Sequence, residues 1–229
     1  MQHNDSTMGQ DLPAMQQDGP AFPPHLETGY HRFRATRYAA DRERYQQLGD
    51  GGQSPSTMVI ACSDSRSAPE AVFDASPGEL FVVRNVAALV PVYAPDERAH
   101  AASAALEFAV LALHVTSIVV MGHGRCGGIQ AAIQDPAPLS MTDFIGTWVA
   151  GVADLTQGLD PTLAKDRGAQ LRALEHRSVE HSIANLRTFP WIAYREAADG
   201  LRLFGAWFDI ALGELHVLTP TGWSLLPEG

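Results

Sequence analysis

The chain has 229 residues, which fits one large domain more easily than two, and 45% of its residues are hydrophobic, enough for a sizeable core. The formal net charge of −10 argues against a general nucleic-acid binder, which would carry a basic patch, although a local arginine can still hold an anionic substrate. Two cysteines are too few for the disulfide framework of a small secreted domain, although one disulfide remains possible on counting alone.

Residues 1–26 are rich in Gln, Asp, Pro and Met and lack periodicity, so we expect a flexible arm there. The arm has no basic start followed by an apolar core, and no run in the chain approaches the ~18 apolar residues of a membrane span. We therefore expect a cytoplasmic protein that does not enter a membrane. Residues 28–48 are charged and helix-forming, which is typical of a surface helix with one packed face. Its aromatic residues at roughly helical spacing are Tyr30, Phe33, Tyr38 and Tyr45.

Three apolar runs that follow the loop DGGQSPS each predict a β-strand. The run TMVIAC does not alternate between apolar and polar residues, which indicates a strand buried on both faces. Strands are expected at 57–62, 80–86 and 117–123, and helices at 96–113, from 127 onward and at 160–186. The segment LRLFGAWFDIALGELHVLTP predicts two more strands joined by a turn at ALGE.

Strands that alternate with helices predict an α/β fold in which helices flank a central, mostly parallel β-sheet. We expect residues 27–229 to form one domain of this kind, preceded by an N-terminal helical arm.

The two cysteines follow different predicted strands. Cys62 ends the first, and Cys126 lies just past the third, which itself ends at His123. Ligands gather outside the carboxyl ends of the strands of open parallel sheets, so these three side chains can come together. Two thiolates and one imidazole suit zinc rather than magnesium or calcium, and three protein ligands leave the fourth position open, as in catalytic sites.

Other interpretations of these residues stay open from the pattern alone. Cys62 could be a small buried hydrophobe, and His123 could be a structural histidine. A disulfide or redox pair would leave the polar neighbours Asp64 and Arg66 without a role, and the cytoplasm disfavours a disulfide. Asp64 and Arg66 could form an ordinary salt bridge. Beside a metal, however, an arginine would keep the aspartate ionised and therefore able only to accept hydrogen bonds.

The motifs CSDSR at 62–66 and GHGRCGG at 122–128 together resemble the β-class carbonic anhydrases. Further blocks, among them PGELFVVRNVAALVP, FIGTWV and GAWFDIALGEL, extend the resemblance from about residue 28 to the end. The resemblance implies the reversible hydration of carbon dioxide to bicarbonate and a proton by zinc-bound hydroxide. It implies one Zn²⁺ per chain, held by Cys62, His123 and Cys126, with Asp64 and Arg66 as a catalytic dyad.

The family pattern also implies a substrate pocket and an oligomer. In plant-type members a glutamine at the place of Gln53 binds a substrate oxygen from the neighbouring subunit, so we expect a homo-oligomer, either a dimer or a dimer of dimers. Phe108 replaces a tyrosine of the plant-type site, and Gly124 replaces the serine that follows the ligand histidine in many members. The positions that match the pocket are Gln53, Phe81, Val86, Phe108 and Gly127.

One subgroup of the family binds bicarbonate at a second, inhibitory site and has a tryptophan where this chain has Val59. Arg84 also belongs to that site, but it lies in the widespread block RNVA. We therefore expect no bicarbonate switch and a site whose fourth zinc ligand is water, rather than a closed form with Asp64 on the metal. Carbonyl sulfide or carbon disulfide hydrolysis on the same scaffold is the alternative activity, and a zinc protein without catalysis is a further one.

Overall fold

The computed structural model describes residues 22–96, 98–134, 137–198 and 200–227. The chain divides into two compact units, Met1–Asp50 and Gly51–Gly229. Most of the arm expected at 1–26 lies outside the described residues. No described helix has both the length and the apolar character needed to cross a membrane.

The helix predicted at 28–48 is three helices, α1 (Pro24–Ala35), α2 (Arg37–Ala40) and α3 (Arg42–Gly51). The helical backbone is interrupted between α1 and α2 at Thr36, where φ is −116° and ψ is −86°. The expected aromatic face is confirmed only in part. Phe33, Tyr38 and Tyr45 pack on one another with ring centroids 5.2–6.1 Å apart, whereas Tyr30 is 55% exposed.

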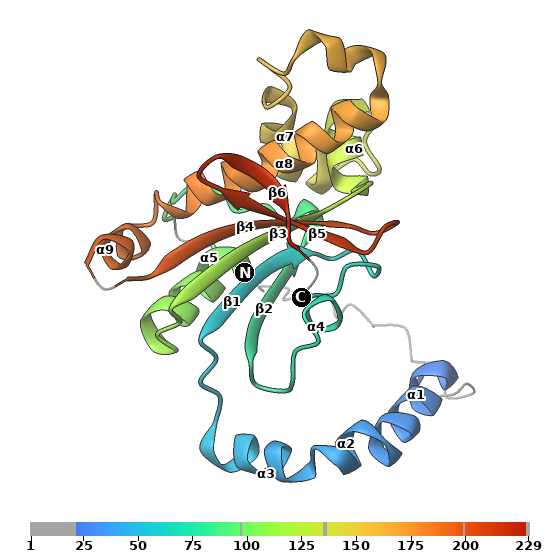
Figure 1. Ribbon diagram of the computed structural model, residues 1–229, viewed down its shortest axis with the longest axis vertical. Helices are drawn as coiled ribbons and strands as arrows, with labels where there is room; N and C mark the ends of the chain where they lie inside the picture. The colour runs from blue at the N-terminus through green and yellow to red at the C-terminus, as the bar shows by residue number, and fades with distance from the viewer. Residues whose placement is uncertain (1–21, 97, 135–136, 199, 228–229) are drawn as a thin grey trace, which may run out of the picture. The chain divides into compact units, whose positions relative to one another are not determined.

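The second unit contains a six-stranded sheet with the order β2-β1-β3-β4-β5-β6 (Figure 1). The first four strands are parallel, and β5 and β6 join antiparallel. This confirms the predicted α/β fold with a mostly parallel sheet. The predicted strands and the turn near ALGE are present, and β6 is an addition. The strands are β1 (Thr57–Cys62), β2 (Leu80–Asn85), β3 (Ser117–His123), β4 (Arg202–Asp209), β5 (Glu214–Thr219) and β6 (Gly222–Leu225).

The helix expected at 96–113 begins later than predicted. Asp96 accepts hydrogen bonds from the backbone N–H of Arg98 and from the ring of His100, and helix α5 starts only at Ala101. After α5 (Ala101–Glu107) the chain continues as a π-helical turn, η2 (Phe108–Ala112), so the predicted end is nearly right.

The segment 160–186 is also divided, because Asp166 caps a new helix by accepting the N–H of Ala169. It forms the short turn η3 (Pro161–Lys165) and the long helix α8 (Arg167–Leu186). Figure 1 shows α8 running across the sheet, where it packs on β3 and β4. The remaining helices are α4 (Pro69–Val72), α6 (Gly127–Gln134), α7 (Phe144–Asp154) and α9 (Pro190–Ala198).

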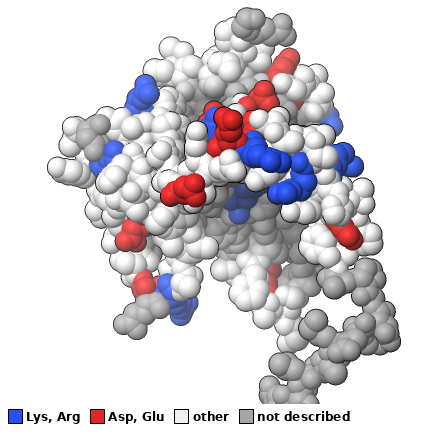
Figure 2. Space-filling model, turned by 90° about the horizontal axis from the view of Figure 1, so that it is seen from below, with Lys and Arg blue, Asp and Glu red and all other residues white. Residues whose placement is uncertain are grey.

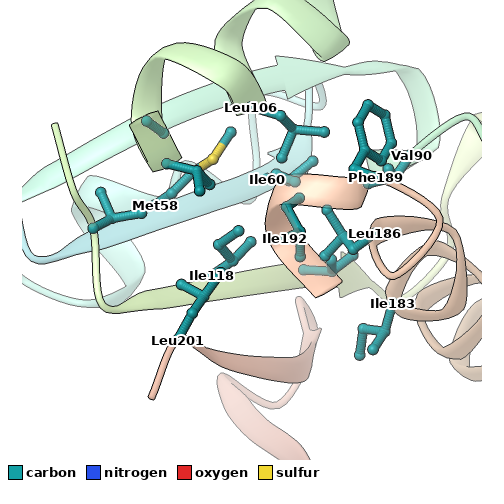
Figure 3. Packing of buried hydrophobic residues seen from close by; sticks show 14 of the residues in the cluster. Met58, Ile60, Val90, Leu106, Ile118, Ile183, Leu186, Phe189, Ile192 and Leu201 are labelled. Atoms are coloured by element: carbon teal, nitrogen blue, oxygen red, sulfur yellow. The ribbon is translucent and has the colours of Figure 1, made fainter. Parts of the chain in front are cut away.

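Side chains on both faces of the central strand β1 are buried, as its unbroken apolar run predicts. In β1, five of the six residues are buried, with Met58 and Ile60 facing one side and Val59 and Ala61 the other. Helices α5, α8 and α9 cover the first face (Figure 3). Buried members of that cluster include Ile60, Leu106, Ile118, Leu186 and Ile192. The burial holds β1 and its neighbour β3 in place, so their last residues, Cys62 and His123, lie at a defined edge of the sheet.

The charged side chains on the face shown in Figure 2 are interspersed rather than sorted by sign. Basic and acidic groups lie beside one another on a largely uncharged surface. That face therefore presents no broad field of a single sign.

Candidate metal centre

The carboxyl ends of β1 and β3 bring the three predicted ligands together. The two strands are parallel neighbours, and they end at Cys62 and His123. The loop after β3 turns back and places Cys126 beside them. The two Sγ atoms are 4.0 Å apart, and the ligand atoms of all three residues lie within 4.8 Å of one another. Both cysteines are free thiols at a separation about twice a disulfide bond, so the disulfide alternative does not fit this structure.

The histidine is oriented for a metal. Nδ1 of His123 lies 3.0 Å from the carbonyl oxygen of Gly124, to which it donates as the protonated nitrogen. Nε2 is then an acceptor, and it is buried without a hydrogen-bond partner among the described residues. Buried polar atoms are rarely left unpaired, and a metal-bound imidazole commonly donates its other nitrogen to a carbonyl. The orphaned Nε2 beside two sulfur atoms fits a zinc ion, whereas a structural histidine would have both nitrogens paired.

The surroundings of Cys62 favour its thiolate. The hydrogen bond shared with Cys126 lowers the pKa of Cys62 to about 4 against the opposing effect of burial, and contacts with His123 and two backbone groups act in the same direction. The same shared bond raises the pKa of Cys126. The backbone N–H of Ala87 also donates to Cys62 Sγ at 3.3 Å, from a left-handed backbone with φ 66°. Two thiol sulfurs and one imidazole nitrogen are the donor set that zinc prefers.

Close packing explains two glycines of the ligand loop. A Cβ on Gly124 would lie 3.1 Å from the Trp207 ring, so the serine common at this position in the family would crowd the tryptophan. A Cβ on Gly128 would lie 2.7 Å from Cγ1 of Val86 and 3.0 Å from Cβ of Ala87. Gly128 therefore lets α6 approach the turn that carries the Ala87 N–H.

Asp64 and Arg66 form a two-pronged ion pair at the edge of the ligand cluster. Arg66 Nε donates to Oδ1 of Asp64 at 2.9 Å, and the guanidinium Nη2 donates to Oδ2 at 2.7 Å. The backbone N–H of Arg66 adds a third bond at 2.9 Å. The side-chain bonds from Arg66, more than any other effect, hold the pKa of the Asp64 carboxyl well below its usual range.

Arg84 holds the backbone that carries this pair. Its Nε donates to the carbonyl oxygen of Cys62 at 2.9 Å and its Nη2 to that of Asp64 at 2.6 Å.

Val59, the position that carries a tryptophan in the bicarbonate-inhibited subgroup, is 1% exposed within the sheet core.

The five predicted pocket residues fall into two groups within one chain. Val86 and Gly127 lie at the carboxyl end of the strands, next to the ligands, and a Cβ on Gly127 would meet no atom within 4 Å. Gln53 precedes β1, and Phe81 opens β2, where its ring contacts Phe108 at 5.9 Å between centroids. At about 3.3 Å per strand residue, Phe81 and Val86 are roughly 16 Å apart. One chain therefore does not bring all five residues to the metal ligands.

Glu175 is a residue of this centre that the sequence analysis missed. It lies in the middle of α8 and is 2% exposed. Its Oε1 accepts the backbone N–H of Cys126 at 2.9 Å, and its Oε2 accepts Nε1–H of Trp207 at 3.1 Å. Burial raises its pKa, and the N–H donors oppose that shift. No motif marks this glutamate, because it is one of several charged residues on a helix whose sequence pattern is typical of a partly exposed helix.

A cavity of about 610 Å³ opens beside the turn that follows β2. Trp148 stands in its wall and donates Nε1–H to the carbonyl oxygen of Val86 at 2.8 Å. The cavity is mostly apolar, and its lining includes Arg84, Val86, His100, Phe144 and Trp148.

Known proteins share both the sequence pattern and the fold. A family model described as carbonic anhydrase matches residues 57–215. Beta carbonic anhydrase 5, chloroplastic, of Arabidopsis thaliana is 38% identical over 182 residues, which cover 77% of this chain and 58% of that protein. Beta carbonic anhydrase 3 of the same plant is 33% identical over 193 residues, which cover 82% of this chain and 73% of that protein. The match thus spans less than two thirds of the chloroplastic relative.

Solved structures agree. The beta-carbonic anhydrase CcaA superposes with a TM-score of 0.80 at 26% identity, over 90% of this chain and 92% of that one. A tetrameric beta-carbonic anhydrase of Sordaria macrospora gives a TM-score of 0.74 at 26% identity, over 85% of this chain and 95% of that one. The family match, the fold and the Cys-His-Cys cluster agree, and the chain belongs to the β class of the carbonic anhydrase family, whose members are zinc enzymes.

Proposed function

We propose that this protein catalyses the reversible hydration of carbon dioxide to bicarbonate and a proton, with one zinc ion per chain. The observation that carries the proposal is the buried cluster of Cys62, His123 and Cys126 beside an aspartate that is held ionised by Arg66. Cys62, His123 and Cys126 would hold the zinc ion, which would lower the pKa of a bound water toward ~7 and so supply hydroxide at neutral pH.

Asp64 selects the orientation of a water or bicarbonate molecule beside it. Because Arg66 occupies both oxygens and keeps the carboxyl ionised, Asp64 can only accept a hydrogen bond. A water or bicarbonate oxygen near it must therefore point its hydrogen at the carboxylate, which leaves a lone pair free for carbon dioxide. The Asp–Arg pair thus favours the orientation in which the oxygen can attack carbon dioxide. In the product, it favours binding of the protonated oxygen of bicarbonate.

The strand-end turn provides an apolar surface for carbon dioxide. The side chain of Val86 is 37% exposed next to the ligand cluster, and a Cβ on Gly127 would meet no atom within 4 Å, so the space beside Gly127 is open. These two groups support the pocket roles that the family resemblance implies for them.

We propose that a second copy of the chain completes the pocket with Gln53, Phe81 and Phe108. The roughly 16 Å between Phe81 in β2 and Val86 just after it supports a contribution from another subunit rather than from the same one. Gln53 and Phe108 are exposed, with Phe108 at 49%, so both are accessible to a partner. The Sordaria relative is described as tetrameric, which agrees with a homo-oligomer. A cytoplasmic location stays a prediction, since one relative is described as chloroplastic.

The test is stopped-flow carbon dioxide hydration on purified protein, with metal analysis and a solution mass on the same sample. We expect one zinc per chain, hydration at rates far above buffer and a mass that corresponds to a dimer or a multiple of it. Cys126→Ala should lose zinc and turnover together, because a ligand is removed. Zinc-loaded protein that hydrolyses carbonyl sulfide but not carbon dioxide would replace the proposal with the alternative activity.

A further inference from the structure

Glu175 is a buried carboxylate that the proposed reaction does not use. It is 2% exposed, and it comes from α8, a helix that supplies no predicted ligand. Glutamates are rarely buried unless hydrogen bonds compensate for the lost hydration. The question is therefore what its hydrogen bonds hold in place.

Both oxygens of Glu175 are bound to groups that surround the ligand loop. Oε1 accepts the backbone N–H of Cys126 at 2.9 Å, and Arg125 is the residue just before this donor. Arg125 has a left-handed φ of 57°, and such a conformation turns successive N–H groups toward a common anion. Oε2 accepts the Nε1–H of Trp207 on β4 at 3.1 Å. The carboxylate thus joins the loop to the sheet.

The same loop reaches the Asp–Arg pair. The carbonyl oxygen of Arg125 accepts a bond from Nη2 of Arg66 at 3.4 Å, and the N–H of Gly124 donates to the carbonyl oxygen of Phe208 at 2.9 Å. A shift of the loop would therefore move Cys126 Sγ and the anchor of Arg66 together.

We propose that Glu175 is a positioning residue for the metal centre. It clamps the Arg125–Cys126 backbone and so keeps the Cys126 sulfur, and the Arg125 carbonyl that accepts from Arg66, in position relative to Cys62 and His123. The inference rests on the zinc centre of the proposed function. Residues that orient ligands typically change metal affinity by about 10–100-fold when they are replaced.

Helix α8 offers a matched control for this clamp. Glu180 lies on the same helix and accepts Nε1–H of Trp223 at 2.7 Å, so it has the same kind of tryptophan partner. Trp223 belongs to β6 and not to the ligand loop. In Glu175→Gln only one end of the amide can accept, so either the N–H of Cys126 or the Nε1–H of Trp207 loses its acceptor, and the link between the loop and the sheet is broken on one side. Glu180→Gln makes the same chemical change without touching the loop.

The experiment measures the zinc dissociation constant of each full-length variant by competition with a chromophoric chelator, with the thermal midpoint recorded alongside. We expect Glu175→Gln to weaken zinc binding by at least tenfold and Glu180→Gln to stay within about twofold of the parent protein. Equal zinc affinities in the two variants would overturn the proposal, even if Glu175→Gln melts at a lower temperature, because the glutamate would then support only the fold.

A second pair of variants decides the matter if Glu175→Gln does not fold. Trp207→Phe removes the donor to Oε2 and keeps a ring over Gly124, whereas Trp223→Phe removes the donor to Glu180. We expect weaker zinc binding only in Trp207→Phe, and equal affinities would overturn the proposal. Zinc content and turnover of the parent protein test the proposed function separately, because a parent without zinc or hydration activity fails that function whatever the variants do.

Discussion

Oδ2 of Asp64 lies 3.8 Å from Nε2 of His123, yet the carboxylate is bonded to Arg66 and not to the imidazole. The separation from the histidine is too long for a hydrogen bond. Asp64 therefore borders the ligand cluster without belonging to it, and Nε2 keeps its lone pair. In the proposed function, this arrangement would leave the aspartate free to accept a hydrogen bond from a substrate or water molecule.

Asp64→Asn is expected to keep zinc and to lose most turnover. The amide can donate a hydrogen bond where the proposed reaction needs an acceptor, and we expect kcat to fall by about 100-fold or more. Stopped-flow hydration and metal analysis of the same preparation measure both effects. Asp160→Asn is the control, since Asp160 caps a surface turn and its carboxyl is exposed. A variant at Asp64 with near-parental rate would remove the aspartate from the mechanism.

Mixing two inactive variants tests whether the pocket spans two subunits. Gln53→Ala and Asp64→Asn damage different groups of residues, so a hybrid dimer would contain one intact site. Random subunit exchange in an equal mixture should then restore about one quarter of parental activity, since half of the dimers are hybrids with one good site each.

The matched control mixes Asp64→Asn with Cys126→Ala. Both changes lie at the carboxyl ends of the strands, in the part of the site that each chain supplies to its own metal centre. Each site of that hybrid therefore still carries one defect, and activity should not recover. If the mixture that contains Gln53→Ala also stays at the average of its components after exchange has been verified by mass, the pocket is formed within one chain.

Gly128→Ala should weaken the zinc centre through packing alone. The new Cβ would meet Val86 at 2.7 Å and Ala87 at 3.0 Å, which displaces the N–H that Ala87 donates to Cys62 Sγ. Overpacking of this kind costs about 1–3 kcal/mol in the free energy of unfolding. Urea unfolding and zinc competition measure the two consequences. Gly151→Ala in α7, where a Cβ meets nothing within 4 Å, should be neutral or slightly stabilising.

His176 should make the fold less stable below neutral pH. Burial, more than the nearby charges of His216 and Arg172, lowers the pKa of His176 to about 4. The unfolded chain has the higher pKa, ~6.5, and takes up the proton first, so stability is complete above that pH and falls as the pH drops toward 4. The loss between pH 7 and pH 5 is about 2 kcal/mol.

Replacement of this histidine by phenylalanine checks that origin. His176→Phe keeps a ring beside Trp223, which stacks on His176 at 4.3 Å between centroids, and removes the titrating group. The difference in unfolding free energy between pH 7 and pH 5 should shrink by about 2 kcal/mol relative to the parent. The same change at His181, an exposed residue of the same helix, is the control for the substitution itself. An unchanged slope in His176→Phe would assign the acid sensitivity to other groups.

Several features follow from the amino-acid sequence because they are local or rest on chain-wide patterns. The runs 57–62 and 117–123 are apolar without alternation, so they became central parallel strands at the predicted residues. Parallel strands end at one edge of the sheet, which is why Cys62, His123 and Cys126 could be grouped from the sequence alone. Asp64 and Arg66 are two residues apart in one loop, within easy reach of each other.

Other features depended on the tertiary structure because they join segments that are far apart in the chain. Glu175 meets the N–H of Cys126 across 49 residues, and only the path of α8 over the sheet selects this glutamate from its charged neighbours. The separation of Phe81 from Val86 follows from the length of β2, because Phe81 lies near its start and Val86 follows its last residue. The predicted start of a helix at Asp96 was wrong, because Asp96 accepts hydrogen bonds from Arg98 and His100 and the helix begins only at Ala101. Pattern determines which residues are buried or polar, whereas packing decides which distant groups satisfy one another.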